Sequence, residues 1–422
     1  MLLRLGSLIT LLCLVFPAHA VLDIEVTGAG EHQTPVSVVS FEGEEQLGLD
    51  QRISEVVAND LKRTGLFKLI DPAGKSPRDL KDVQFSDWQD VAALAFGRVA
   101  RLPNDRIEVR FHLMDAVQKK ELVGQAISAS SRQYRAIAHR ISDLIYEKLT
   151  SSPGVFSTRI AYVNHQGKRS RLVVADSDGY GEQTLLDSVQ PIMSPAWSPD
   201  GESLAYVSFE RGRALVYSQL LTSRDRKLLA AFPGSNSAPA WSPDGKLLAL
   251  VLTQDGNSQV YLVRPDGTNL RRISSSDTID TEPNFSPDSR YIIFTSDRGG
   301  SAQIYRMSVN GGEAERLTFD GSNNFSPRYS PDGKSFVFTH FNDGIFHIAV
   351  QDFETRQVQI LTPGGWEKKP SFAPNGKLVL FATEAGGRGI LATVSSDGRV
   401  KQKMTPQQGD IREPTWGPFV RR

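Results

Sequence analysis

The sequence PAWSPDGE at residues 195–202 returns almost unchanged as PAWSPDGK at residues 239–246. Related strings stand at four further places, which are PNFSPDSR at 283–290, PRYSPDGK at 327–334, PSFAPNGK at 370–377 and PTWGPFVR at 414–421. Successive strings begin 44, 44, 44, 43 and 44 residues apart. This period is typical of a propeller blade and too long for a helical-pair repeat. The repeat therefore predicts a β-propeller.

Each string predicts a turn followed by a strand. A type I turn favours Ser at its first position, Pro at the second and Gly at the fourth, which is the order in Ser-Pro-Asp-Gly. The Pro two residues before the aromatic is expected at the entry of a strand, where a missing N–H is tolerated. The aromatic side chains are expected to pack between neighbouring blades; they are Trp197, Trp241, Phe285, Tyr329, Phe372 and Trp416.

The number of blades follows from how the repeats begin and end. Each full period carries β-branched and aromatic runs for four short strands. Residues 159–163 and 171–174 match the second and third strands of a blade, but no Pro-x-Trp string precedes them. The string PTWGPF at 414–419 supplies the missing inner strand, and residues 159–422 number 264, six times 44. The sequence predicts an all-β, six-bladed propeller whose carboxyl-terminal strand closes the first blade.

The chain begins with the pattern of a secretory signal peptide. Arg4 precedes an apolar run at 8–16, and Ala18-His19-Ala20 matches a cleavage site. We expect cleavage after Ala20, which also removes Cys13, the single cysteine. The 48 basic and 48 acidic residues of the whole chain balance, so no global charge favours nucleic acid or anionic lipid.

Residues 21–150 predict an α/β domain with an exposed amino-terminal strand. Apolar residues at helical spacing indicate one helix ending at Gly65 and a second beginning at Ser131. A short helix is expected from Ser86 or Asp87 through Leu94, and strands are expected at 35–41, 67–70, 95–101, 106–115 and 120–130. The predicted order is thus a signal peptide at 1–20, the α/β domain at 21–150, a linker at 151–158 and the propeller at 159–422.

A search for catalytic chemistry finds no convincing pattern. The sequence contains no Gly-x-Ser-x-Gly nucleophile elbow, and its histidines lack the spacing of metal ligands. The repeated Asp-Gly corners differ from sialidase boxes because the aromatic precedes the Ser. We expect no catalytic residue, cofactor or metal. The loops that enter the inner strands differ from one another, so they are candidates for recognition, with plain solvated loops as the alternative.

The whole chain resembles the TolB family of the Tol-Pal envelope system. The resemblance is specific in STRIAYV at 157–163, SDGYGEQTLL at 177–186, QPIMSPAWSPDGESLAYVSFERGRALV at 190–216 and TEPNFSPDS at 281–289. It implies a non-enzymatic periplasmic adaptor that supports outer-membrane integrity and envelope constriction at cell division. It further implies that the loop-bearing end of the propeller receives the peptidoglycan-associated lipoprotein Pal. The residues expected there are Ser194, Ser235, Asn236, Ala238, Asp280, Thr281, Glu282, Asn323, Asn324, Lys368 and Arg412.

The resemblance also implies that the mature amino-terminal segment binds TolA and is hidden or released according to Pal occupancy. The segment consists of Val21, Leu22, Asp23, Ile24, Glu25 and Val26. Its alternation of apolar and acidic side chains independently suits backbone pairing with a sheet edge, and Gly28-Ala29-Gly30 would let it swing. Other outer-membrane or peptidoglycan-associated proteins are further candidate partners. We expect a monomer with no nucleic-acid partner and no membrane insertion. A carbohydrate- or peptidoglycan-acting propeller is the alternative.

Overall fold

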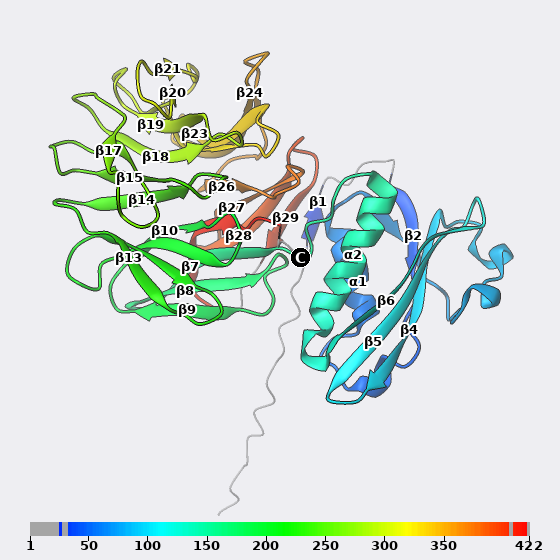
Figure 1. Ribbon diagram of the computed structural model, residues 1–422. Coiled ribbons are helices and arrows are strands. Elements are labelled where there is room, and N and C mark those ends of the chain that lie inside the picture. The colour runs from blue at the N-terminus through cyan, green and yellow to red at the C-terminus, as the bar shows by residue number, and fades with distance from the viewer. Residues whose placement is uncertain (1–24, 28–32, 405–407, 420–422) are drawn as a thin grey trace, which may run out of the picture.

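The computed structural model describes residues 25–27, 33–404 and 408–419. An α/β domain, blue to cyan in Figure 1, lies beside a β-propeller that runs from green to red. The predicted signal peptide at 1–20 lies outside the described residues. Within the described ranges, no helix has the length and apolar character needed to cross a membrane.

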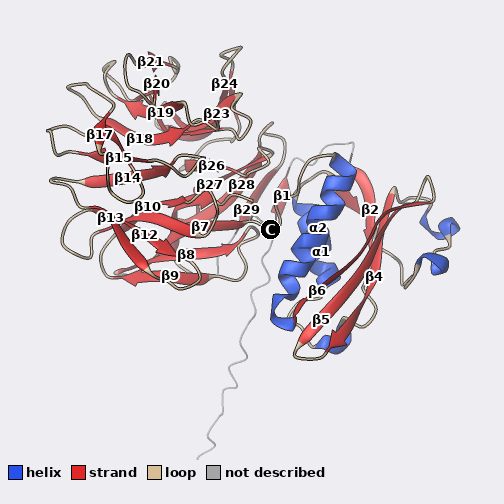
Figure 2. Ribbon diagram, in the orientation of Figure 1, coloured by secondary structure: helices blue, strands red, loops and turns tan. Residues whose placement is uncertain are grey.

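The α/β domain is a five-stranded mixed sheet in the order β3-β2-β4-β5-β6, with α1 (Ile53–Arg63) and α2 (Tyr134–Thr150) packed together (Figure 2). Its strands are β2 (Thr34–Val38), β3 (Phe67–Leu69), β4 (Ala93–Leu102), β5 (Arg106–Asp115) and β6 (Lys120–Ser130). Val57 and Leu61 of α1 and Ile141 of α2 are fully buried in one core with β5, as the apolar spacing of both segments predicts. Short 3-10 turns complete the domain at η1 (Glu45–Leu47), η2 (Leu80–Asp82), η3 (Phe85–Trp88) and η4 (Ser131–Gln133).

One predicted element of this domain is wrong. The short helix expected from Ser86 or Asp87 through Leu94 is only the 3-10 turn η3, and Leu94 already belongs to β4. Leu94 is fully buried against Trp88 and Phe96. Packing of an extended β4 therefore overrides the local helical pattern.

The propeller has six four-stranded blades, which confirms the predicted fold. Blade 1 joins β30 (Asp410–Trp416) to β7 (Arg159–Gln166), β8 (Arg169–Asp176) and β9 (Gln183–Ser188). Blade 2 contains β10 (Ile192–Trp197), β11 (Ser203–Ser208), β12 (Leu215–Leu220) and β13 (Arg226–Ala230). Blade 3 contains β14 (Asn236–Trp241), β15 (Leu248–Leu252), β16 (Gln259–Val263) and β17 (Arg271–Arg272).

The remaining blades repeat this order. Blade 4 contains β18 (Asp280–Phe285), β19 (Tyr291–Ser296), β20 (Gln303–Ser308) and β21 (Glu315–Arg316). Blade 5 contains β22 (Asn323–Tyr329), β23 (Ser335–Asn342), β24 (Ile345–Asp352) and β25 (Val358–Ile360). Blade 6 contains β26 (Lys368–Phe372), β27 (Leu378–Ala385), β28 (Arg388–Ser395) and β29 (Lys401–Met404). The short strand β1 (Glu25–Thr27) adds to its outer edge.

The closing strand and the corner turns form as the sequence predicts. Strand β30 pairs antiparallel with β7 from Asp410 opposite His165 to Trp416 opposite Ile160, so blade 1 is built from both ends of the propeller sequence. At the first corner, the amide of Gly201 donates to the carbonyl of Ser198 across 2.9 Å. The six repeat aromatics lie in apolar clusters that join adjacent blades.

Candidate partner-binding end of the propeller

The two ends of the propeller differ in what covers them. The Ser-Pro-Asp-Gly turns and the turns between third and fourth strands lie at one end, here called the corner end. The α/β domain contacts this end, where Arg63 Nη2 donates to Ser177 Oγ at 2.7 Å. The linker meets the same end, because Asn375 Nδ2 donates to the carbonyl of Pro153 at 3.0 Å. The loops that enter the inner strands lie at the opposite end, here called the loop end. Within the described part of the chain, the contacts of the α/β domain thus lie at the corner end and leave the loop end uncovered.

Each inner strand carries a bulge at the residue before its repeat proline. The pairing register shifts there in all six blades, and the bulged residues have left-handed φ angles between 46° and 56°. We call these residues the bulge ring; they are Ser194, Ala238, Glu282, Ser326, Lys369 and Glu413. The prolines thus lie inside their strands, which corrects the prediction that they stand at strand entries. A bulge at a sheet edge tolerates the missing N–H equally well.

Charged members of the bulge ring meet across the central channel, where a cavity of about 240 Å³ lies. Lys369 Nζ pairs with Glu282 and lies 3.7 Å from Glu413 Oε2. The amide and hydroxyl of Ser326 both donate to Glu282 at 2.7 Å. Burial opposes the charge of Glu282, but Lys369 and Ser326 overcome it and lower its pKa to about 2. Burial likewise opposes the charge of Lys369, whereas Glu282 and Glu413 raise its pKa. These groups tie blades 4, 5, 6 and 1 together.

Three residues expected to contact a partner are buried by their own loops. Asn236, Asp280 and Asn324 are fully inaccessible to solvent. Asn236 Nδ2 donates to the carbonyl of Phe232 at 2.9 Å, Asp280 forms an ion pair with Arg298 at 2.9 Å, and Asn324 Nδ2 donates to Gln303 at 2.8 Å. We therefore revise their expected role from direct contact to shaping the loops.

The other expected residues remain reachable at or near the loop end. Ser235 is exposed, and the rest are partly exposed; these are Ser194, Ala238, Thr281, Glu282, Asn323, Lys368 and Arg412. The structure adds exposed apolar side chains that the sequence reasoning missed, namely Val189, Met193, Ile279 and Phe319. Phe319 is 70% exposed and Val189 is 65% exposed. The sequence could have indicated these residues, because they are apolar residues within otherwise polar loops. Exposed apolar groups at one face of a protein mark interaction surfaces.

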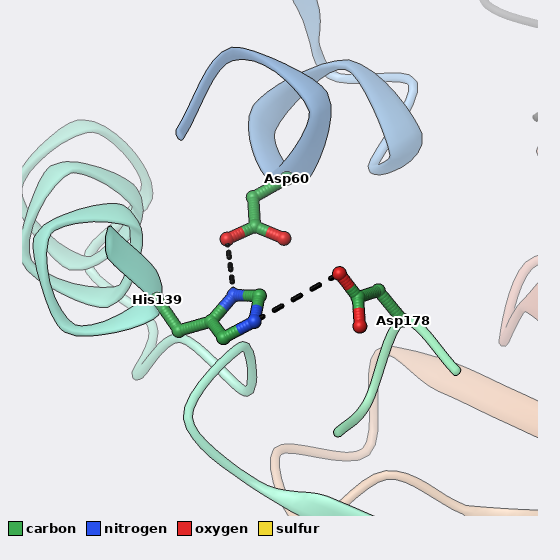
Figure 3. A group of neighbouring side chains, drawn as sticks. All are labelled: Asp60, His139 and Asp178. Atoms are coloured by element: carbon green, nitrogen blue, oxygen red, sulfur yellow. Dashed lines mark hydrogen bonds and ion pairs between the residues drawn. The ribbon is translucent and has the colours of Figure 1, made fainter. Parts of the chain in front are cut away.

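A second cluster of charges lies between the α/β domain and blade 1 (Figure 3). His139 of α2 bonds through Nδ1 to Asp60 of α1 at 2.7 Å, and its Nε2 lies 3.8 Å from Asp178 of the propeller. These three side chains lie close enough to share a metal ion. However, Arg135 pairs with Asp178, and Arg63 Nη2 lies 3.4 Å from Asp60. Fixed guanidinium groups already balance both carboxylates, so the cluster is better suited to joining the domains than to holding a cation.

The amino-terminal segment is described in part. Val21, Leu22, Asp23 and Ile24 lie outside the described residues, whereas Glu25 and Val26 belong to β1. Strand β1 pairs antiparallel with β29, with Glu25 opposite Lys403, Val26 opposite Gln402 and Thr27 opposite Lys401. The segment thus uses backbone pairing at a sheet edge, as its alternating sequence predicts.

These features define a six-bladed propeller protein with an α/β domain on its corner end and varied loops at the opposite end. Comparison with known proteins shows to which family of propeller proteins the chain belongs. Residues 22–122 match the TolB amino-terminal domain, and residues 146–420 match the TolB beta propeller domain. The chain therefore belongs to the TolB family.

Individual relatives agree over nearly the whole length. The chain is 58% identical over 418 residues to the Tol-Pal system protein TolB of Nitrosomonas europaea, covering 99% of this chain and 98% of the relative. It is 61% identical over 403 residues to that of an Azoarcus species, covering 94% and 93%. The crystal structure of TolB from Acinetobacter baumannii superposes with a TM-score of 0.86 at 37% identity, covering 94% of this chain and 100% of that one.

Proposed function

We propose that this protein is a non-enzymatic periplasmic adaptor of the Tol-Pal system. In this proposal the loop end binds Pal, and the segment at 21–26 binds TolA. Through these two contacts the protein supports outer-membrane integrity and envelope constriction during cell division. The relatives' names as Tol-Pal system proteins support the proposal, and so does a loop end that carries exposed apolar side chains away from the α/β domain.

The observation that carries the adaptor proposal is the short pairing of β1. Within the described ranges, three residue pairs join β1 to β29, so little of the pairing described there has to break before the segment is free. A strand that adds to one sheet edge can add to another by the same hydrogen bonds. Docking on blade 6 and docking on a partner are then alternatives for one segment.

Removal of residues 21–31 from the mature chain tests this proposal. We expect the deletion to abolish TolA binding and to preserve Pal binding, each measured separately by calorimetry. Unchanged TolA binding would contradict the assigned role of the segment.

The proposed binding of Pal is tested by a pull-down in which the purified, intact mature chain is mixed with envelope extract. Recovery of Pal supports the adaptor proposal. Turnover of muropeptides by the purified protein, without recovery of Pal, would instead favour the carbohydrate-acting alternative.

A further inference from the structure

We infer that Lys368 is the receptor at the loop end for a carboxylate of the docked protein partner. This inference rests on the proposal that a protein binds this end. It adds the chemistry of the partner, which must present an Asp or Glu side chain to this position.

Lys368 is held by an aromatic platform formed by Phe341, Phe346 and Trp366. Its Nζ lies 4.0 Å from the ring centre of Phe346 and 4.2 Å from that of Trp366. The rings of Phe341 and Phe346 are 4.5 Å apart. Two backbone hydrogen bonds between Phe346 and Gly365, of 2.9 and 3.1 Å, fix the platform across blades 5 and 6. The ammonium group is therefore oriented before any partner arrives.

Lys368 differs from its charged neighbours Lys369 and Arg412 in its ion pairing. Lys369 pairs with Glu282, and Arg412, which stacks on Trp366 at 3.7 Å, pairs with Asp410 at 3.0 Å and Glu384 at 3.2 Å. Among the described residues, no carboxylate forms an ion pair with Lys368 within 4.0 Å. Burial and the nearby Arg412 lower the pKa of Lys368, and this effect outweighs the opposing attraction of Glu384, which already pairs with Arg412. A partner carboxylate would give Lys368 a counter-ion at ion-pair distance.

Large aromatic residues and arginine commonly contribute most of the binding energy at protein interfaces. Trp and Arg are enriched among the few side chains that account for most binding energy, especially where a rigid surface is already formed. Trp366 lies against both Lys368 and Arg412, with ring-centre distances of 4.2 and 3.7 Å. The arrangement would give both affinity and selection for an acidic partner surface.

Lys368→Met tests the inference, because methionine keeps the apolar stem and removes the charge. We expect its affinity for the soluble domain of Pal to fall about tenfold or more, with a shallower dependence on salt concentration. Lys368→Arg should recover most of the affinity. Lys246→Met removes an exposed lysine at the corner end and should bind as the wild type does. Equal affinity and salt dependence of Lys368→Met and the wild type would overturn the inference.

Failure of the wild type to bind Pal would contradict the proposed function and call for a second test of Lys368. A carbodiimide activates a partner carboxyl group, the Lys368 amine attacks it, and an amide forms with release of the urea. The intact chain is crosslinked in this way in envelope preparations, and the joined peptides are sequenced by mass spectrometry. An amide between Lys368 and an Asp or Glu of an identified protein supports the inference. Amides at the loop-end residue Lys168 without any at Lys368 would overturn it.

Discussion

Glu282 has a left-handed backbone conformation, which glycine adopts most easily. This conformation directs its carboxylate across the channel. Its φ angle of 55° turns the side chain of Glu282 toward Ser326 and Lys369 in the next two blades. Left-handed non-glycine residues cost roughly 1–3 kcal/mol and persist where the surroundings hold them in place. The ion pair with Lys369 and the two hydrogen bonds from Ser326 stabilise this conformation of Glu282.

Glu282→Gln should therefore destabilise the propeller by about 2 kcal/mol, because it leaves Lys369 without its nearest counter-ion. Since the pKa of Glu282 is lowered to about 2, its contribution is present above pH 4.5 and is lost as the pH falls through about 2. Urea unfolding at pH 7 and pH 3 measures both effects. The exposed control Glu354→Gln should change stability by less than about 0.5 kcal/mol. Equal stability of Glu282→Gln and the wild type at pH 7 would rule out a structural role for the pair.

Ala238 tests the backbone of the bulge ring without any charge. Its φ is 46°, where a β-branched side chain is strongly disfavoured. We expect Ala238→Val to lower the free energy of unfolding by roughly 2 kcal/mol and Ala238→Gly to stay within about 1 kcal/mol of the wild type. Urea denaturation of the two variants measures these changes. Similar decreases in the free energy of unfolding for both variants would indicate that side-chain contacts matter at this position, and not backbone strain.

At the scale of the element, β30 decides whether the ring is closed. Trp416 is 7% exposed, and its Nε1 donates to Thr158 Oγ1 at 2.8 Å, so it joins the last strand to the segment before β7. The same residue packs with Ile160 and Leu380 of blades 1 and 6. Its side chain thus supports both the pairing within blade 1 and the contact between blades.

Trp416→Ala should cost about 3–5 kcal/mol, the range for removing a large buried aromatic side chain. Phe419→Ala, three residues later and 38% exposed, should have little effect and serves as the control. Thermal unfolding of the two variants measures the difference. Equal melting temperatures would mean that β30 contributes little to closure.

The elements that could be predicted are those that depend on residues close together in the sequence. Turn residues such as Ser198 and Gly201 recur with a fixed period, so the six blades and the closing strand could be predicted. The bulge ring could not, because a bulge depends on the register between two strands. Aligning the residues before the six prolines would have drawn attention to Glu282 and Lys369. The aromatic platform around Lys368 and the pairing of His139 with Asp178 require distant segments to meet, which periodicity does not reveal.

At the scale of the whole molecule, the contact between domains contains a buried histidine whose pKa is raised by neighbouring carboxylates. His139 faces Asp60 of α1 and Asp176 and Asp178 of blade 1, while Arg135 and Arg63 lie beside the same carboxylates. The guanidinium groups of Arg135, Arg63 and Arg159 also interact with these carboxylates. Protonation of His139 is favoured because both of its ring nitrogens face carboxylate oxygens, Asp60 at 2.7 Å and Asp178 at 3.8 Å (Figure 3). Burial alone would lower the pKa of His139, but Asp60, Asp178 and Asp176 raise it above 6.5.

The domain contact should therefore weaken as the pH rises. A raised pKa in the folded state means that the stabilisation is complete below pH 6.5 and disappears as the pH passes the folded pKa. Each unit of the increase corresponds to about 1.4 kcal/mol. Thermal unfolding between pH 5.5 and 9 should show a loss of stability in the wild type that His139→Gln lacks and Asp178→Asn reduces. His112→Gln removes a histidine that also pairs with a carboxylate, Glu121, but lies within the α/β domain, so it should keep the wild-type slope. A wild-type slope in His139→Gln would assign the pH dependence to other groups and leave the interdomain cluster with a purely structural role.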